Sequence, residues 1–155
     1  MPKKSAGILL FRFANSKLEV FLVHPGGPFW INKDLNSWSV PKGEFADDEE
    51  PLEAARREFE EETGIALPEA DFIPLVPVSQ KSGKQIYCYA CMGDLDPVKI
   101  KSNTFEIEWP PKSGSKKSFP EIDRGEWFAV PEAKRRVIEA QTGLIDQLID
   151  ILKIS

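Results

Sequence analysis

Runs of apolar residues along the chain predict short strands, and apolar residues recur near helical spacing in two places. Strands are expected at 6–13, 18–24, 72–80, 84–92, 104–109 and 126–130, with a further short one in 37–45 that ends at a tight exit at Pro41–Gly43. The polar stretch 110–120 predicts a loop. From Pro131 a helix is expected, whose apolar face consists of Val137, Ile138, Leu144, Ile145, Leu148, Ile149 and Leu152. Without a repeat or a long linker, this order predicts one mixed α/β domain over residues 1–155.

The other predicted helix lies between Gly43 and Ile65, in GEFADDEEPLEAARREFEEETGI, where ten of the 23 residues are Asp or Glu. Asp47 or Asp48 can cap its N-terminus, Pro51 suits its first turn, and Gly64 marks its end. On a wheel of about 100° per residue, three carboxylates share one face roughly 100° wide. They belong to Glu58, Glu61 and Glu62, and the apolar stripe beside them consists of Leu52, Ala55, Phe59 and Thr63.

Local stability does not explain this acidic face. Like charges at such spacings destabilise a helix by a few tenths of a kcal/mol per pair. Glu61 and Glu62 also lie in the last turn, where the helix dipole disfavours negative charge. A hard divalent cation would offset both effects, because Mg²⁺ prefers carboxylate oxygens and also engages phosphates. A solvated, Glu-rich surface is the alternative explanation of such a charge run.

The same stretch resembles the signature of the Nudix hydrolases, G-x5-E-x7-R-E-U-x-E-E-x-G-U, in which U is a bulky apolar residue. All nine defined positions match, at Gly43, Glu49, Arg57, Glu58, Phe59, Glu61, Glu62, Gly64 and Ile65. The resemblance implies the Nudix fold, an α/β/α sandwich with a mixed β-sheet. It also implies that a metal-activated water cleaves a nucleoside diphosphate linked to another group, with Mg²⁺ as the cofactor and Mn²⁺ as its substitute.

The resemblance also implies a role for each matched polar residue. Glu58, Glu61, Glu62 and the backbone carbonyl of Gly43 are implied to bind the metal. Glu49 and Arg57 are implied to fix the preceding loop against the helix, which orients the ligands. Within the signature, the expected catalytic residues are therefore Arg57, Glu61 and Glu62.

The signature leaves the general base open between Glu121 and Glu61. Glu121 stands five residues before Glu126 in FPEIDRGEWF. This offset resembles that of family members cleaving oxidised nucleotides, in which a loop Glu is the base. A solvated loop acid is the alternative for Glu121. Glu106 and Glu108, which alternate on a predicted strand, are further candidates.

Substrate contacts are expected from residues outside the helix. The segment PKGE, which leads into the signature, resembles that of the branches acting on dinucleoside polyphosphates and diphosphoinositol polyphosphates. Lys42 is therefore a candidate for a phosphate contact. A plain surface lysine is the alternative. Trp30 and Trp109 are candidates for stacking on a base. The expected substrate is a dinucleoside polyphosphate or an oxidised nucleoside triphosphate. The alternatives are ADP-ribose, a diphosphoinositol polyphosphate, or nucleotide binding by a regulator without catalysis.

Composition further limits the classes of binding partner and the compartment that we expect. The formal charge of −5, without a basic stripe, argues against extended nucleic acid and anionic membranes. Cys88 and Cys91 fall on a predicted strand and are expected to be buried structural thiols, consistent with a reducing cytoplasm. The single histidine, His24, is expected to have a structural or loop-ordering role, with a substrate contact as the alternative and no zinc site. A monomer and a homodimer are both compatible with this sequence.

Overall fold

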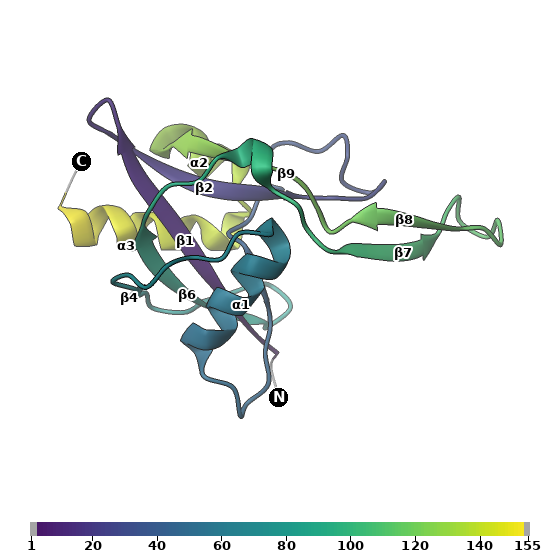
Figure 1. The fold of residues 1–155 in the computed structure, drawn as a ribbon, viewed down its shortest axis with the longest axis horizontal. Helices are drawn as coiled ribbons and strands as arrows, with labels where there is room; N and C mark the ends of the chain where they lie inside the picture. The colour runs from purple at the N-terminus through teal and green to yellow at the C-terminus, as the bar shows by residue number, and fades with distance from the viewer. Residues whose placement is uncertain (1–2, 154–155) are drawn as a thin grey trace.

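The computed structural model describes residues 3–153. Figure 1 shows the course of the chain. The strands are β1 (Lys4–Ala14), β2 (Lys17–Pro25), β3 (Lys42–Glu44), β4 (Ile73–Pro74), β5 (Val78–Ser79), β6 (Gln85–Met92), β7 (Thr104–Glu108), β8 (Lys116–Pro120) and β9 (Ile122–Ala129). The α-helices are α1 (Pro51–Thr63), α2 (Val130–Arg136) and α3 (Thr142–Leu152), and short 3₁₀ turns lie at Pro97–Lys99 and Glu139–Gln141.

Seven strands form one mixed sheet with β1 in its interior. The order is β4-β6-β1-β2-β9, while β3 pairs with β1 and β5 pairs with β6. Strands β1 and β6 are parallel, whereas β2 is antiparallel to both β1 and β9. Strand β3 is antiparallel to the start of β1, with Gly43 opposite Ala6. This pairing places the glycine that opens the signature on the sheet, next to the helix that follows it.

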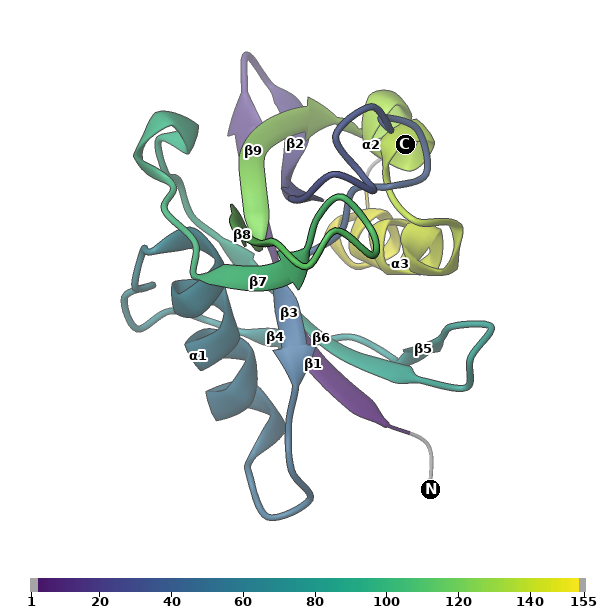
Figure 2. The same ribbon diagram turned by 90° about the vertical axis from the view of Figure 1, so that its right-hand side faces the viewer.

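Helices cover the sheet on both faces, as Figure 2 shows, with α1 on one side and α2 and α3 on the other. The side chains of β1 alternate between two cores. Ile8 and Leu10 pack with Phe59 of α1, while Leu9 and Phe11 belong to the core that α3 completes. Burial of both faces accounts for the nearly continuous apolar run in this strand. The predicted α/β/α sandwich with a mixed sheet is confirmed.

Helix α1 begins where Pro51 predicts, but the predicted cap by Asp47 or Asp48 is wrong. The N-cap residue is Glu50, which is extended (φ −66°, ψ 130°) and makes no side-chain capping bond. Pro51 has no N–H to satisfy, and its fixed φ suits a first turn, so the helix can start without a side-chain cap. The predicted end is confirmed, since Gly64 follows the helix with a φ of +74°, which favours glycine.

Strands β7 and β8 form a hairpin that projects from the body of the molecule (Figure 1). The prediction of a loop over 110–120 is therefore wrong for β8. Phe105 and Phe119 are cross-strand partners with ring centroids 6.1 Å apart, and Glu108 is opposite Lys116. Such pairs stabilise a two-stranded ribbon. The polar composition of β8 concealed this strand in the sequence.

The predicted C-terminal helix is two helices, because the chain is extended at Val137 and Ile138. Trp38 forms an isolated parallel bridge with Val137, and its carbonyl accepts the N–H of Ile138 at 2.8 Å. Val137 and Ile138 therefore lie in the connection between α2 and α3. The buried indole of Trp38, edge-on to Phe128 at 4.9 Å, fixes this connection to the core. The other apolar residues predicted on the helix face do lie on α3 and pack on the core, namely Leu144, Ile145, Leu148, Ile149 and Leu152.

Three predicted strands have different limits. The range 72–80 contains only the short strands β4 and β5, since Pro74 and Pro77 lack the N–H that a ladder needs. The last strand begins at Ile122 rather than at 126, because it pairs with the whole end of β2. The prediction that the chain leaves the strand in a tight turn at Pro41–Gly43 is wrong, because Lys42 and Gly43 belong to β3.

The two cysteines are buried free thiols, as predicted. They belong to opposite cores, Cys88 to that of α3 and Cys91 to that of α1. Burial raises the pKa of Cys88 to about 12 and also raises the pKa of Cys91. Both thiols therefore remain protonated at neutral pH. Within residues 3–153, no helix is both long enough and apolar enough to cross a membrane.

Candidate functional site

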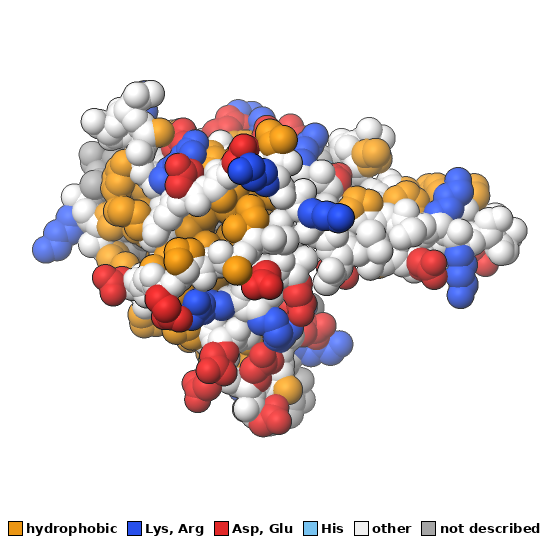
Figure 3. Space-filling model, viewed as in Figure 1, with side chains coloured by type: hydrophobic (Ala, Val, Ile, Leu, Met, Phe, Trp, Pro, Cys, Tyr) orange, Lys and Arg blue, Asp and Glu red, His pale blue; other side chains and the backbone are white. Residues whose placement is uncertain are grey.

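The acidic residues of α1 lie beside the face that this helix buries. The buried positions are Ala54, Ala55, Phe59 and Thr63. Glu58 and Glu62 are half-buried, and Glu61 is exposed. Acidic side chains gather over α1 and the loop before it on the face seen in Figure 3. The three carboxylates singled out in the sequence thus border the core instead of pointing to the far side of the helix.

The carboxylate of Glu58 packs directly against Gly43 of β3, so a side chain at position 43 would displace it. A Cβ placed on Gly43 would lie 2.1 Å from the carboxylate of Glu58. One residue earlier, the N–H of Lys42 donates to Oε1 of Glu62 at 3.1 Å. The glycine therefore allows two carboxylates of α1 to reach the backbone of β3.

Arg57 connects the loop before α1 to the acidic face. Its Nε and Nη2 each donate to the carboxylate of Glu49 at 3.0 Å. Its Nη1 donates to Glu58 at 3.1 Å and to Glu61 at 3.3 Å. The hydrogen bonds with Glu49, followed by nearby carboxylate charge, raise the pKa of Arg57. The bidentate pair with Glu49 fixes the guanidinium, which in turn orients two of the three carboxylates.

Burial and like charge disfavour the ionised forms of these carboxylates. Burial raises the pKa of Glu62 to about 8, against the hydrogen bond from Lys42, and the charges of Glu58 and Glu121 add to the rise. The pKa of Glu58 is also raised, mainly by burial and then by Glu61. A cation between them would favour the ionised forms and so offset both causes.

The donor set fits a hard divalent ion, although its side chains are not gathered around one point. In the described range 3–153, no three His, Cys, Asp or Glu side chains form a group that could hold a metal ion. Glu58 and Glu61 instead share Nη1 of Arg57, and Glu62 turns to the N–H of Lys42. Hard divalent ions prefer carboxylate oxygens, and three carboxylates lie on neighbouring turns beside Gly43.

A cavity of about 210 Å³ opens next to Glu62. Its charged lining consists of Lys42, Glu62 and Glu121, and Trp30 contributes an aromatic wall. Burial, followed by the charge of Lys84, lowers the pKa of Lys42. The other lining residues are Val23, Pro25, Ser37, Ser39, Ile122 and Ile138. The fold thus brings four candidate residues together from β3, α1, the junction between β8 and β9, and the loop after β2.

Trp109 does not line this cavity. Its ring packs edge-on against Phe29, with centroids 5.3 Å apart, at the end of β7. Glu106 and Glu108 lie on the same hairpin, and Glu108 accepts the N–H of Lys112 at 2.7 Å. All three are separate from the residues that surround Glu62 and Glu121.

Two serines of the cavity were missed in the sequence. The hydroxyl of Ser37 is buried and has no hydrogen-bond partner within the described residues, so it is available to a ligand. The hydroxyl of Ser39 accepts from Gln141 at 2.9 Å and donates to the carbonyl of Val40 at 2.7 Å. Their alternation with the buried Trp38 was a signal that they face away from the core.

Comparison with known proteins gives a match over nearly the whole chain. A family model described as the NUDIX domain matches residues 1–148. An octanoyltransferase of Myxococcus xanthus is 32% identical over 100 residues, which cover 64% of this chain but only 25% of that protein. An RNA pyrophosphohydrolase of Bartonella henselae is 27% identical over 152 residues, covering 81% of this chain and 75% of the relative.

Solved structures share the fold at low sequence identity. The Ap4A hydrolase of C. elegans, as a binary complex, aligns with a TM-score of 0.69 and 17% identity over 96% of this chain and 98% of its own. The NUDIX domain of Shewanella oneidensis NrtR, complexed with ADP ribose, aligns with a TM-score of 0.66 and 19% identity over 98% and 89% of the two chains. The layered sheet and its helices are thus a known architecture.

Proposed function

The chain belongs to the NUDIX domain family and is a Nudix hydrolase, and on this premise we propose that it is a Mg²⁺-dependent pyrophosphohydrolase. Its substrate is a nucleoside diphosphate derivative, either a dinucleoside polyphosphate or an oxidised nucleoside triphosphate. The observation that carries this proposal is the common cavity of Lys42, Glu62 and Glu121, directly beside the acidic face of α1. This cavity brings together the ammonium group of Lys42, the signature carboxylate of Glu62 and the candidate general base Glu121.

The proposed metal ligands are Glu58, Glu61, Glu62 and the carbonyl of Gly43. When bound, Mg²⁺ supplies Lewis-acid polarisation of phosphate oxygens and lowers the pKa of a water. Arg57, fixed by Glu49, orients Glu58 and Glu61 toward the loop. These contacts keep the acidic face in place before the substrate arrives.

The substrate contacts follow from the cavity lining. The ammonium group of Lys42 neutralises charge on the diphosphate, and Trp30 stacks on the base. Glu121 accepts a proton from the attacking water, with Glu61 as the alternative base. The new P–O bond forms as the P–O bond of the anhydride breaks, and the nucleotide leaves.

A substrate panel in ¹⁸O-labelled water tests the proposal. The panel contains diadenosine tetraphosphate, an oxidised purine triphosphate, ADP-ribose and a diphosphoinositol polyphosphate, each with Mg²⁺, with Mn²⁺ and with EDTA. We expect at least one nucleotide of the proposed class to be hydrolysed with Mg²⁺ and none with EDTA. The ³¹P spectrum identifies the phosphorus that takes up the label, and hence the bond cleaved. Full activity in EDTA would contradict the metal assignment.

A second candidate function is hydrolysis of the pyrophosphate linkage at the 5′ end of an RNA. Its support is the RNA pyrophosphohydrolase that is 27% identical over most of this chain. The net charge of −5 opposes binding of a long RNA, although it leaves room for recognition of a terminus alone. A short RNA with a 5′-triphosphate therefore belongs in the panel, and a preference for it over the free nucleotides would establish this second function.

Replacing Gly43 by Ala is expected to weaken metal binding and catalysis together. The new Cβ would lie 2.1 Å from the carboxylate of Glu58, which has to move away from β3. Misplacement of one ligand corresponds to a loss of about 10- to 100-fold in metal affinity. Titration of the activity with Mg²⁺ measures this loss of metal affinity. Gly83→Ala is the control, since a Cβ at Gly83 meets nothing within 4 Å, although its positive φ favours glycine. An unchanged Mg²⁺ titration in Gly43→Ala would contradict the proposed metal site beside Gly43.

The proposed setting is a reducing compartment such as the cytoplasm, which the two free, buried thiols favour. The proposed partner is a small nucleotide, with no membrane and no extended nucleic acid. One domain over residues 1–155 suffices for the proposed site, because its residues all belong to the sheet, α1 and their loops.

A further inference from the structure

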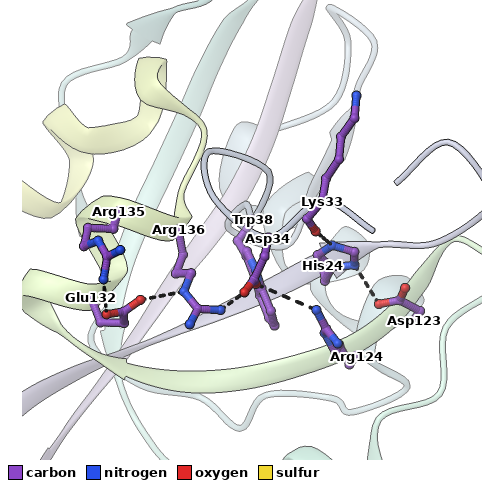
Figure 4. A network of polar contacts seen from close by, with 9 residues as sticks. All are labelled: His24, Lys33, Asp34, Trp38, Asp123, Arg124, Glu132, Arg135 and Arg136. Atoms are coloured by element: carbon purple, nitrogen blue, oxygen red, sulfur yellow. Dashed lines mark hydrogen bonds and ion pairs between the residues drawn. The ribbon is translucent and has the colours of Figure 1, made fainter. Parts of the chain in front are cut away.

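His24 is fully buried at the end of β2, and both of its ring nitrogens face hydrogen-bond acceptors. Nδ1 lies 2.9 Å from Oδ1 of Asp123, and Nε2 lies 2.5 Å from the carbonyl oxygen of Lys33 (Figure 4). A carbonyl oxygen only accepts, and so does an ionised carboxylate. Since a neutral imidazole has a single N–H, both contacts are satisfied with an ionised Asp123 only if each nitrogen carries a proton.

The surrounding charges are compatible with an imidazolium. Asp123 is the carboxylate in contact with the ring. Arg124, the register partner of His24 on β9, is turned to Asp34 at 3.8 Å and lies over the Trp38 ring. That ring packs edge-on against His24, with centroids 5.2 Å apart.

The other cations near the ring are engaged elsewhere. The Lys33 side chain points away from His24 in Figure 4, and its ammonium lies 4.9 Å from the Trp30 ring centroid. Arg136 pairs with Asp34 and Glu132. A buried charge needs such a paired environment, because an unpaired one would be costly.

Through Asp123, the ring fixes the segment that carries Glu121. The ladder between β2 and β9 is irregular at His24 and Pro25, where the register shifts. Just beyond, the N–H of Gly26 donates to the carbonyl of Glu121 at 2.8 Å. A side-chain bond and a main-chain bond on either side of this irregularity therefore hold the segment of Glu121, together with the bond from the N–H of Glu121 to the carbonyl of Asn103 at 2.8 Å.

Through Lys33, the same ring fixes the turn that carries Trp30. The N–H of Lys33 donates to the carbonyl of Trp30 at 2.9 Å, so the residue held by His24 closes that turn. Trp30 itself is 38% exposed and has no core packing to hold it. The imidazole is thus the link between two walls of the cavity that come from separate segments.

We propose that His24, protonated on both nitrogens, is a positioning residue that aligns Trp30 and Glu121 across the cavity. Its effect on turnover rests on the proposed function, whereas its protonation state does not. The ring does not line the cavity, and its hydrogen-bond partners, Asp123 and the carbonyl of Lys33, are not proposed metal ligands. It acts by holding the substrate-stacking turn and the base-carrying segment at a fixed separation.

The protonation state is tested directly by NMR. His24 is the only histidine, so long-range ¹H–¹⁵N correlations of the labelled chain report on this ring alone. We expect both nitrogens to be protonated at about pH 7.5, without metal or substrate. A ring with a single N–H would overturn the proposal whether or not the protein hydrolyses any nucleotide. Asp123→Asn keeps an acceptor for Nδ1 but removes the charge, and is expected to yield a singly protonated ring under the same conditions.

Kinetics test the positioning. His24→Gln is expected to lower kcat and raise KM, with kcat/KM reduced about 10- to 100-fold. Asp123→Asn is expected to do the same to a smaller extent, and it covers the case in which His24→Gln does not fold. By contrast, Trp30→Ala should change mainly KM and Glu121→Gln mainly kcat. A purely structural role would lower the melting temperature but leave both constants of the folded enzyme unchanged, and that result would overturn the proposal.

Glu132→Gln is the matched control. Glu132 belongs to the network of Figure 4 through Arg135 and Arg136 but makes no contact with His24. Its variant should keep the doubly protonated ring and the wild-type kcat/KM. An equal loss in the control would assign the effect to the network as a whole and overturn the specific role of His24.

Discussion

Glu62→Gln is expected to lower kcat/KM by about 10³-fold or more while leaving the fold intact, because a bound ion contributes several kcal/mol of transition-state stabilisation. The amide oxygen of glutamine can still accept the N–H of Lys42, the contact that Glu62 makes at 3.1 Å. Loss of the negative charge therefore changes ligation without creating a cavity. Since burial raises the pKa of Glu62 to about 8, the neutral side chain should also be well tolerated in the folded state.

Two measurements separate this effect from damage to the protein. Isothermal titration with Mn²⁺ should show weaker ion binding in Glu62→Gln, and thermal unfolding should show a midpoint at or above that of the original chain. Glu60→Gln is the control, since Glu60 is exposed on the other side of α1 and should leave both activity and ion binding unchanged. Wild-type turnover in Glu62→Gln would remove Glu62 from the metal site.

The signature and its helix were predictable because each position has a local physical reason. Pro51 starts the helix, Gly64 ends it in the left-handed region, and Phe59 lies in the apolar stripe. These features depend on residues a few positions apart, which periodicity detects directly. The order of strands and helices predicted a mixed α/β domain, whereas the α/β/α layering was implied by the resemblance to the Nudix signature.

The cavity was less predictable because it depends on pairing between distant segments. Ser37 and Ser39 face it only because Ser39 bridges to Val23 of β2, and β8 exists only because Phe119 meets Phe105 across a hairpin. No local pattern identifies such partners, and the polar residues of 110–120 favoured a loop. Glu121 was singled out from its offset, but its place beside Glu62 required the register of β2 and β9.

Glu121→Gln is expected to lower kcat by about 10²- to 10³-fold with little change in KM, as for loss of a general base. Glu121 lines the cavity with Glu62, and its carboxylate is exposed enough to reach a water there. Because Glu121 is not a proposed ligand, the Mg²⁺ concentration for half-maximal activity should stay the same. Glu126→Gln is the matched control, because Glu126 is an exposed Glu on β9, the strand that follows Glu121, and should behave as the original chain.

The rival base, Glu61, makes a different prediction, because Glu61 is also a proposed metal ligand. Glu61→Gln should lose activity together with affinity for Mg²⁺, so that excess Mg²⁺ restores part of the rate, whereas excess Mg²⁺ should restore nothing in Glu121→Gln. If Glu121→Gln retained the full rate while Glu61→Gln lost it at every Mg²⁺ concentration, the base would be Glu61. Glu121 would then be a solvated acid at the mouth of the cavity, and the alignment by His24 would serve Trp30 alone.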